Sequence, residues 1–371
     1  AGSTLTFTDV SGCGFGSSAG TFNSNGTSGS PNTVTSSASG TPSNYWDFDL
    51  AAGSTVDLDY TTIDKAGGAD LIGTSDMAAI SIDNCTFQNS DREIYINGSD
   101  ISSFTNTTIT GMRRGIRMYG GAYAAFDNIT ISSCSHDDVR TQGTNAKLEF
   151  VDSSFDVSST TLNSSGDSII SKNHNDVAND CQMILPTGTV TPTDLSGFTD
   201  TLADQNVTIY KHASYDPVLT IDTASIDMGG LIIPAGSAVN HEAGIAFTVT
   251  GDVDVTGVYT GGTGVPTFGS LLINSGGVFS ASSGTTTLNG EGRGYSGYPS
   301  AIENQGTFTH NNGTILINGT GDQDIEMDGT GNFYNLTVNK SNNDLVHQAN
   351  LVVENNLDVT MAAEHSLRPY A

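Results

Sequence analysis

The chain has 371 residues, of which 36% are hydrophobic, 14% are charged and 44 are glycine, a composition typical of extracellular all-β proteins. Forty Asp and Glu residues against 12 Lys and Arg residues give a formal net charge of −28. This charge repels nucleic acid and anionic lipid, and no apolar run approaches the length of a membrane span, so we expect no nucleic-acid partner and no membrane insertion.

Residues 1–50 are predicted to form an N-terminal cap and irregular first turns of a solenoid. They begin with an alternating strand, Leu5–Thr8, and then become rich in Gly, Ser and Asn. The open end of a solenoid pairs with other strands unless it is covered. Trp46, the single tryptophan, and Phe48 are expected to seal that end. Stacking of Trp46 on a sugar is the alternative interpretation.

Residues 51–180 contain a recurring phrase of six residues. It begins at positions separated by 24, 22, 22 and 24 residues: Leu58, Ile82, Phe104, Phe126 and Phe150. A fixed period of this size indicates a repeat architecture in which each unit buries its apolar side on its neighbours. The units are β-branched and alternating, with no helical period. We therefore predict a right-handed parallel β-helix.

A column of asparagines is expected at one corner of this β-helix. Turns stacked about 4.8 Å apart place equivalent side chains above one another. Asn84, Asn106 and Asn128 hold equivalent positions, with Tyr60 and Asp152 replacing Asn at the two ends. Asparagine tolerates left-handed backbone and bonds to nearby backbone groups. We interpret the three asparagines as a structural ladder without a chemical role.

Two successive loops carry the candidate site residues. Arg113, Arg114 and Arg117 concentrate three of the chain's few cations, and the following loop carries His136, Asp137 and Asp138. In an enzyme, the two carboxylates would supply acid and base with the histidine beside them, while the arginines would hold an anionic sugar.

A structural interpretation of the same residues is the alternative. Loops stacked one turn apart would pair Arg with Asp in a cluster of salt bridges. Adjacent aspartates on a strand also point in opposite directions. We therefore prefer the interpretation in which none of these residues is catalytic. If the protein is an enzyme, Asp137, Asp138 and His136 are the candidate catalytic residues.

One further segment bears on catalysis. Gly166–Lys172 resembles the Gly-Asp-Asp-x-Ile-x-x-Lys region of polygalacturonase-like β-helices. The second aspartate of that pattern is Ser168 here, and no Gly-His-Gly follows. This chain therefore lacks one of the catalytic carboxylates of that region.

The second half of the chain is predicted to form a less regular solenoid. Residues 181–245, with four prolines, are expected to be an irregular junction that contains strands. Residues 246–371 are expected to form a second β-solenoid part with a C-terminal tail. The repeat there is visible because residues 277–290 align with residues 306–319 at an offset of 29.

An acidic stretch in this half is the candidate metal site. Asp322, Asp324, Glu326 and Asp328 precede Gly329, in a pattern that resembles a Ca²⁺ loop. The twelfth position counted from Asp324 is Asn335 instead of the required Glu. An exposed acidic edge strand that prevents pairing is the alternative. Ca²⁺ is the one cofactor considered, and otherwise none is expected.

Three segments are similar to a known family: Leu5–Phe15, Gly29–Ser36 followed by Val56–Tyr60, and Gly331–Val338. They resemble Gly/Ser/Thr-rich β-helix proteins of marine and environmental phages and of bacterial surfaces. The resemblance implies a structural or adhesive subunit of an extracellular assembly, such as a phage fibre, a capsid decoration or a cell-surface filament. No catalytic residue of the family maps onto this chain.

The expected partners follow from this interpretation. Self-association as a homo-oligomer or filament is expected, because open β-helix ends and flat parallel faces favour homotypic packing. Surface polysaccharide is the second expected partner, bound by the loops. The alternative function is a polysaccharide depolymerase of the tailspike type, acting as a glycoside hydrolase or lyase.

Overall fold

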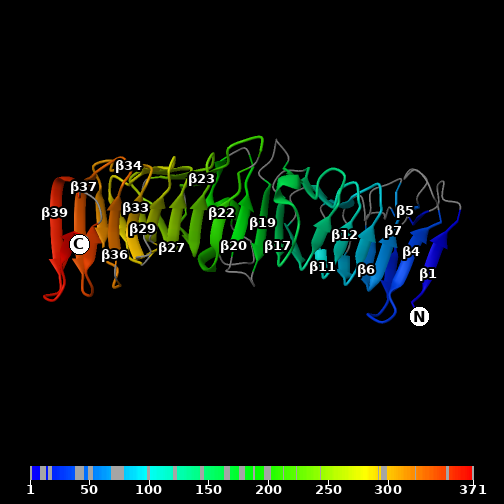
Figure 1. The fold of residues 1–371 in the computed structure, drawn as a ribbon. Coiled ribbons are helices and arrows are strands. Elements are labelled where there is room, and N and C mark those ends of the chain that lie inside the picture. The colour runs from blue at the N-terminus through cyan, green and yellow to red at the C-terminus, as the bar shows by residue number, and fades with distance from the viewer. Residues whose placement is uncertain are drawn as a thin grey trace. The chain divides into compact units, whose positions relative to one another are not determined.

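A computed structural model describes most of the chain. The described residues are 2–8, 14–15, 19–37, 46–48, 53–67, 79–97, 101–119, 123–142, 146–162, 168–174, 180–186, 189–195, 202–211, 213–222, 224–242, 244–290, 292–293, 299–321, 323–347 and 351–369. They fall into two compact units, Ala1–Asp176 and Val177–Ala371. Within each unit the strands of successive turns lie side by side (Figure 1).

Each regular turn of unit 1 contributes one strand to each of three parallel sheets. Sheet 1 contains β1 (Thr4–Phe7), β4 (Asn32–Ser36), β7 (Thr61–Asp64), β9 (Thr86–Gln88), β12 (Thr108–Thr110) and β15 (Thr130–Ser132). Sheet 2 contains β10 (Ile94–Asn97), β13 (Ile116–Tyr119), β16 (Val139–Thr141) and β18 (Thr160–Thr161). Sheet 3 includes β3 (Thr21–Asn25), β6 (Thr55–Asp59), β8 (Ala79–Asp83), β11 (Ile101–Thr105), β14 (Tyr123–Asp127), β17 (Lys147–Val151) and β19 (Ile169–His174).

The interior of unit 1 is a file of stacked apolar side chains. Leu58 pairs in register with Ile82, which pairs with Phe104, and Phe126 pairs with Phe150. The rings of Phe104 and Phe126 have centroids 5.2 Å apart, and those of Phe126 and Phe150 are stacked at 4.6 Å. All five side chains are at most 1% exposed. The predicted parallel β-helix is confirmed, and its five repeat positions lie in one file.

Two columns of left-handed residues turn the chain at its corners. Between sheets 3 and 1, the corner residues have φ values from 43° to 52°: Tyr60, Asn84, Asn106, Asn128 and Asp152. The backbone N–H groups of the first four donate to carbonyls of the next turn, as Asn106 does to Asp127 at 3.0 Å. A second such corner follows sheet 1, at Lys65, Asn89, Gly111 and Ser133.

The N-terminal turns of unit 1 bury the single tryptophan. Trp46 is fully buried, its ring stacks on Phe7 with centroids 5.2 Å apart, and its indole N–H donates to the carbonyl of Asp64 at 3.0 Å. A buried indole presents no face to a sugar. Phe48 lies in β5 (Asp47–Phe48), which pairs with β2 (Gly14–Phe15), and its side chain is outside the described residues.

Unit 2 is built in the same way. Its sheet 4 contains β21 (Thr189–Val190), β23 (Val218–Ile221), β26 (Ala238–His241), β28 (Val258–Gly261), β30 (Val278–Ser280) and β34 (Thr307–Thr309). The long strands β27 (Ala246–Val255) and β29 (Val265–Ile273) each contribute to the two remaining faces. One face also has β24 (Ile226–Met228), β31 (Thr285–Leu288), β35 (Thr314–Ile317), β37 (Phe333–Lys340) and β39 (Val353–Met361).

The remaining strands of unit 2 complete the third face. They are β20 (Asp180–Ile184), β22 (Asn206–Ile209), β25 (Gly230–Ile233), β33 (Pro299–Asn304), β36 (Gln323–Met327), β38 (Leu345–His347) and β40 (Leu367–Pro369). Strands between residues 206 and 241 therefore join the same sheets as the strands that follow. Beyond these sheets, β32 (Gly292–Arg293) pairs antiparallel with β33.

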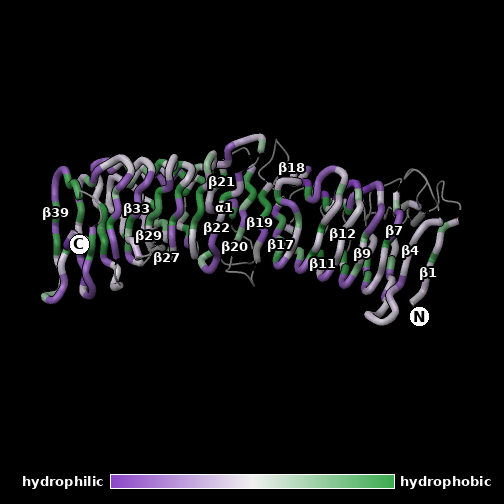
Figure 2. The backbone as a smooth tube through the Cα atoms, viewed as in Figure 1, coloured by the Kyte–Doolittle hydropathy of each residue, from purple (hydrophilic) through white to green (hydrophobic). Residues whose placement is uncertain are grey.

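The offset of 29 residues seen in the sequence is confirmed by the pairing in unit 2. Phe279 pairs with Phe308, and Leu288 pairs with Ile317. The ring of Phe279 stacks on that of Tyr259 at 4.7 Å and lies 6.0 Å from that of Phe308. Hydrophobic and hydrophilic residues alternate along the strands in both units (Figure 2), as strands with one buried face require.

The described helices are few and short. The α-helix α1 (Pro192–Leu195) has four residues, and the 3-10 helices η2 (Val157–Ser159) and η3 (Leu202–Asp204) have three each. In the part of the chain that the structure describes, no helix has the length and apolar character needed to cross a membrane.

Candidate functional site

The outer side of sheet 2 gathers arginine and tyrosine side chains. Alternation buries Ile94, Ile116 and Val139 in the core. The next residue of each strand points outward, and strand register places Tyr95, Arg117, Arg140 and Thr161 in one column. Tyr119 lies two residues beyond Arg117 on the same side and is 43% exposed. We call this surface, together with Glu93, Arg114 and Asp137, the arginine face.

Ion pairs fix the arginines of this face. The Glu93 carboxylate, whose side chain is 2% exposed, lies 2.7 Å from Arg117 and 3.3 Å from Arg114. The Asp137 carboxylate lies 3.0 Å from Nε of Arg114 and 3.7 Å from Arg140. Three guanidinium groups thus share two carboxylates. A buried carboxylate such as that of Glu93 requires paired cations to offset its lost hydration.

Aromatic rings complete the arginine face. The guanidinium carbon of Arg117 lies 4.7 Å from the centroid of the Tyr95 ring, within the range of a cation–π interaction. The rings of Tyr95 and Tyr119 have centroids 6.3 Å apart. Arg117 also donates to the side-chain oxygen of Gln142. Guanidinium forks match carboxylates, and tyrosine rings combine an apolar body with a polar tip, so this surface has the chemistry of a glycan contact.

The predicted catalytic candidates have separate surroundings. Asp137 points outward, where it pairs with Arg114 and accepts a hydrogen bond from the hydroxyl of Thr161 at 2.7 Å. Asp138 is 5% exposed and accepts from the backbone N–H of Asp156 at 2.9 Å. Burial raises the pKa of the Asp138 carboxyl. His136 is exposed, with Nδ1 3.2 Å from the hydroxyl of Ser135. The structure therefore does not bring these three described side chains into one groove.

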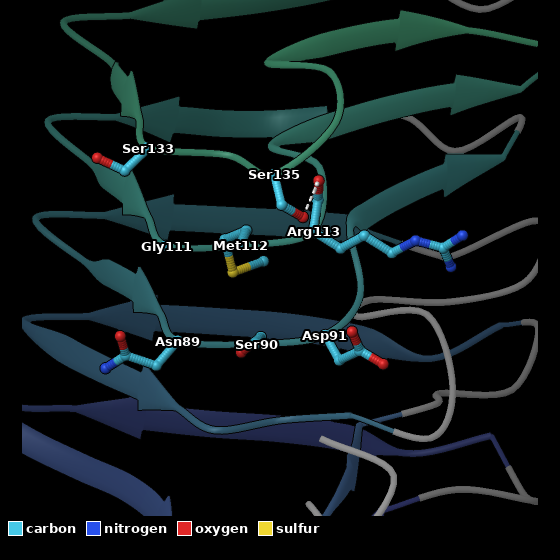
Figure 3. A pocket seen from close by; sticks show the side chains of 8 residues that line it. All are labelled: Asn89, Ser90, Asp91, Gly111, Met112, Arg113, Ser133 and Ser135. Atoms are coloured by element: carbon cyan, nitrogen blue, oxygen red, sulfur yellow. Dashed lines mark hydrogen bonds between the residues drawn. The ribbon is translucent and has the colours of Figure 1, made fainter. Parts of the chain in front are cut away.

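The three predicted sugar-binding arginines divide between two surfaces. Arg114 and Arg117 belong to the arginine face through Glu93. Arg113 instead borders a shallow groove of about 350 Å³ at the second left-handed corner (Figure 3). The residues that line this groove are Asn89, Ser90, Asp91, Gly111, Met112, Arg113, Ser133 and Ser135. In Figure 3 the Arg113 side chain extends away from Met112 and Gly111.

The acidic residues predicted as a metal site lie in unit 2. Asp324 and Glu326 are on β36, Asp328 follows it, and Asp322 is outside the described residues. Glu326 pairs in register with Glu303 of β33. Burial, followed by repulsion from Glu303 and Asp328, raises the pKa of Glu326 to about 7. Among the described residues, no three His, Cys, Asp or Glu side chains are grouped so as to hold a metal ion.

The asparagine ladder uses carboxylate acceptors that sequence reasoning missed. The amide of Asn84 donates to Asp59 at 3.1 Å, and that of Asn106 donates to Asp83 at 2.9 Å. Only Asn128 donates to another ladder member, Asn106, at 2.8 Å. The signal was present in the sequence, because an aspartate directly precedes the corner in several repeats.

Sequence reasoning also missed two of the partners of the arginines. Glu93 and Tyr95 were not among the candidates, although Tyr95 precedes Arg117 by 22 residues, which is one repeat. The period that aligned the inward residues therefore aligns these outward residues as well.

Residues 49–191 match the family described as the right-handed beta helix region. This stretch includes every residue of the arginine face. No curated protein and no solved structure matches the chain. The chain is a right-handed parallel β-helix, a fold often found in surface or glycan-binding proteins and in enzymes that act on polysaccharides.

Proposed function

We propose that this protein is a non-enzymatic structural and adhesive β-solenoid of an extracellular assembly on a virion or cell surface. In this proposal the arginine face contacts surface glycans. The observation that carries it is the column formed by Tyr95, Arg117 and Arg140 beside the exposed ring of Tyr119.

The charge distribution supports a local contact at this face. Five of the seven arginines of the chain lie between residues 92 and 140, although the net charge is −28. On the arginine face, three guanidinium groups outnumber two carboxylates. An acidic polysaccharide is repelled by most of an acidic protein, so its carboxylates would find their attractive partners on this face.

The ion pairs also support a preformed contact surface. Glu93 and Asp137 hold the guanidinium planes in place before any ligand arrives. A ligand that meets side chains already held in position loses less affinity to ordering. The stacked turns of unit 1 present these groups one turn apart, so a chain of sugars lying across the strands would meet them in succession.

Binding to carboxylated polysaccharides tests this function. The variants Arg140→Gln and Tyr119→Ala change a half-buried and an exposed group of the face, and Thr260→Ala on sheet 4 of unit 2 is the matched control. We expect each face variant to weaken binding to alginate or pectate by about tenfold, the loss of ~1.4 kcal/mol. The control variant should bind as the unchanged protein does. Absence of any glycan binding, or binding indifferent to both face variants, would contradict the proposal.

The depolymerase alternative has its own test. A glycosidase needs two carboxyl groups placed on either side of one bond, whereas Asp137 and Asp138 have different described partners. Incubation with acidic polysaccharides, followed by assays for reducing ends and unsaturated products, measures turnover directly. Turnover that disappears in Asp137→Asn or Asp138→Asn would overturn the non-enzymatic proposal.

Self-association is the second part of the proposed function. Strand β39 pairs with β37, and Leu357 and Val359 continue the files that Leu336 and Val338 occupy. These two side chains of β39 are 49% and 42% exposed. Apolar side chains on an exposed strand favour pairing with another chain.

Light scattering after size-exclusion chromatography tests this association. We expect species larger than a monomer, with a shift toward monomer in the variant Leu357→Lys/Val359→Lys. Electron microscopy of the same fractions would show whether the larger species are filaments. A monomer at all concentrations would contradict self-association without affecting the glycan proposal.

A further inference from the structure

The outer side of sheet 1 carries an unbroken column of threonines. Strand pairing places six of them opposite one another, one per turn: Thr4, Thr33, Thr62, Thr86, Thr108 and Thr130. No pairing between these strands contains a register shift. Each threonine is half-buried or exposed. The column therefore forms a continuous, accessible row of hydroxyl and methyl groups.

A second outward column lies two residues further along each strand. It consists of Thr6, Thr35, Asp64, Gln88, Thr110 and Ser132. Ten of the 12 positions in the two columns carry a hydroxyl group, one carries a charge and none is aromatic. We call this two-column surface the threonine face.

The geometry of the threonine face is a two-dimensional lattice. Neighbouring strands lie about 4.8 Å apart, and outward residues along one strand lie about 6.6 Å apart. Threonine is β-branched, so its χ1 angle is restricted and its hydroxyl and methyl groups keep fixed positions. The left-handed corners before and after the strands limit the face on both sides.

The hydroxyls of the first column are available for outside contacts. In the second column Thr35 donates to Asp64 at 2.6 Å and Ser132 donates to Thr110 at 3.2 Å. Among the described residues, by contrast, no side-chain hydrogen bond involves the six hydroxyls of the first column. A hydroxyl both donates and accepts hydrogen bonds, as water does. These six groups can therefore take places in an ordered layer of water.

We infer that the threonine face binds the surface of ice. A repeating lattice of hydroxyl and methyl groups, almost free of charge, is complementary to a crystal of water whose oxygens also repeat in two dimensions. The methyl groups favour ordered water around them, and the hydroxyls anchor that water to the protein. Because the side chains are held in advance, binding orders water with little loss of protein entropy.

Other occupants fit this face less well. Protein interfaces are enriched in aromatic residues, Met and Arg, and the face contains none of them at its 12 positions. A flat sugar-binding surface would use aromatic rings against the sugar, and those lie on sheet 2 instead. The inference is thus independent of the glycan contact proposed for the arginine face.

Unit 2 supplies an internal comparison. The matching outward positions of sheet 4 hold aliphatic residues in four successive strands: Val218, Ala238, Val258 and Val278. Val258 and Val278 are 39% and 36% exposed. Sheet 4 therefore has the same strand spacing with an aliphatic first column, while its second outward column still carries the hydroxyls of Thr220, Thr260, Ser280 and Thr309. Lysine substitutions on it are controls for changes of charge on a flat sheet.

Partition of the fluorescently labelled full chain into slowly grown ice tests the inference. We expect enrichment in the ice, together with thermal hysteresis and inhibited recrystallisation in the unlabelled protein. The variant Thr86→Lys/Thr108→Lys should reduce the enrichment at least about tenfold, equal to ~1.4 kcal/mol. The control Thr260→Lys/Val258→Lys should partition as the unchanged protein does. Circular dichroism spectra and melting curves of all variants establish that the fold is kept.

A gentler pair of variants separates the hydroxyl from the methyl group. Thr86→Val/Thr108→Val keeps shape and β-propensity, and Thr86→Ser/Thr108→Ser keeps the hydroxyls. We expect both to weaken ice binding less than the lysine pair. Exclusion of the unchanged protein from ice would overturn the inference, as would equal enrichment of the folded lysine variant.

Two further outcomes would also overturn the inference. In the first, the unchanged protein has no affinity for ice but is retained on crystalline cellulose or chitin, and the lysine pair abolishes this retention. That result would assign the face to polysaccharide binding. In the second, the unchanged protein has no affinity for ice but forms a dimer, and the lysine pair disrupts this dimer. That result would assign the face to contact with a second copy of the chain.

Discussion

Units 1 and 2 have similar interiors and differ in the side chains on their outer faces. Phe104, Phe126 and Phe150 follow one another in a buried row in unit 1, as Tyr259, Phe279 and Phe308 do in unit 2, although Phe104 meets Phe126 edge to face and the other ring pairs are stacked. The outward residues of sheet 1 form a threonine lattice and those of sheet 2 an arginine face, whereas the outward row of sheet 4 is aliphatic in four strands. Inward residues therefore set the fold, and outward residues are free to acquire function.

The corners of the two units differ as well. In unit 1, the left-handed corner residues Asn84 and Asn106 donate to carboxylates of the preceding turn. Unit 2 has left-handed glycines at Gly236, Gly276 and Gly331, besides left-handed asparagines at Asn311, Asn312 and Asn343. Glycine reaches this conformation without a side chain. The polar corners of unit 1 thus add hydrogen bonds between turns that glycine corners lack.

The largest expected effect tests whether the two interiors are equivalent. Phe126→Ala and Phe279→Ala each remove a fully buried ring from a stacked file. We expect each to lower the free energy of unfolding of its own unit by about 3–5 kcal/mol. Urea unfolding followed by hydrogen exchange measures the loss unit by unit. A loss below about 1 kcal/mol in either unit would show that its file is not tightly packed.

The next effect contrasts the outer faces. Glu93→Gln leaves two arginines without their shared carboxylate, and we expect a loss of about 2–4 kcal/mol because that carboxylate is buried. Val258→Thr on sheet 4 should stay within about 0.5 kcal/mol. Chemical unfolding curves give both values. Equal effects would mean that the ion pairs of the arginine face add nothing to its stability.

The corners give a smaller effect. Asn106 has φ 49°, so Asn106→Ala introduces left-handed strain and removes the hydrogen bond to Asp83. We expect a loss of about 1–2 kcal/mol, and less for Asn106→Gly. In unit 2, Gly276→Ala, at φ 87°, should cost about 1 kcal/mol from strain alone. Melting curves compare the three. A larger loss for Asn106→Gly than for Asn106→Ala would contradict the left-handed requirement.

The smallest effect concerns acid stability of unit 2. His241 is 1% exposed, with Nδ1 3.0 Å from the hydroxyl of Tyr259 and Nε2 2.7 Å from the carbonyl of Ile245. Burial lowers the pKa of His241 from its usual value of 6.5. The unfolded state therefore binds the proton first, and the stability present above about pH 6.5 decreases as pH falls, by at most about 1.4 kcal/mol per pH unit.

A variant isolates this contribution. His241→Gln removes the titrating group, so its unfolding free energy should change less between pH 7 and pH 5 than that of the unchanged protein. If the unfolding free energies of the variant and the unchanged protein fall in parallel as pH decreases, groups other than His241 cause the acid sensitivity.

The fold was predictable because its signal is periodic. The spacing of Leu58, Ile82 and Phe104 indicated both the repeat and the residues whose side chains point inward. The offset of 29 in unit 2 carried the pairing of Phe279 with Phe308. In each case one rule, that like residues stack, was sufficient.

The sites were less predictable because they depend on which outward residues become neighbours. Pairing of arginine with aspartate between the two stacked loops was anticipated and is confirmed for Arg114 and Asp137. The role of Glu93 depends on the side-chain directions of two arginines one turn away, which the period alone does not give. The threonine column is present in the sequence at Thr62, Thr86 and Thr108, but these residues lie outside the inward positions on which the predicted repeat was based.

Cross-linking of engineered cysteines tests most directly whether outward side chains stack in columns. Thr62→Cys/Thr86→Cys joins adjacent turns of sheet 1, where Cα atoms about 4.8 Å apart suit a disulfide. Thr62→Cys/Thr108→Cys spans two turns, roughly 10 Å, beyond disulfide reach. After mild oxidation, peptide mapping by mass spectrometry should find the intramolecular bond in the first variant and not in the second. Equal bond formation in both, or in neither, would contradict the columns on which both proposed faces depend.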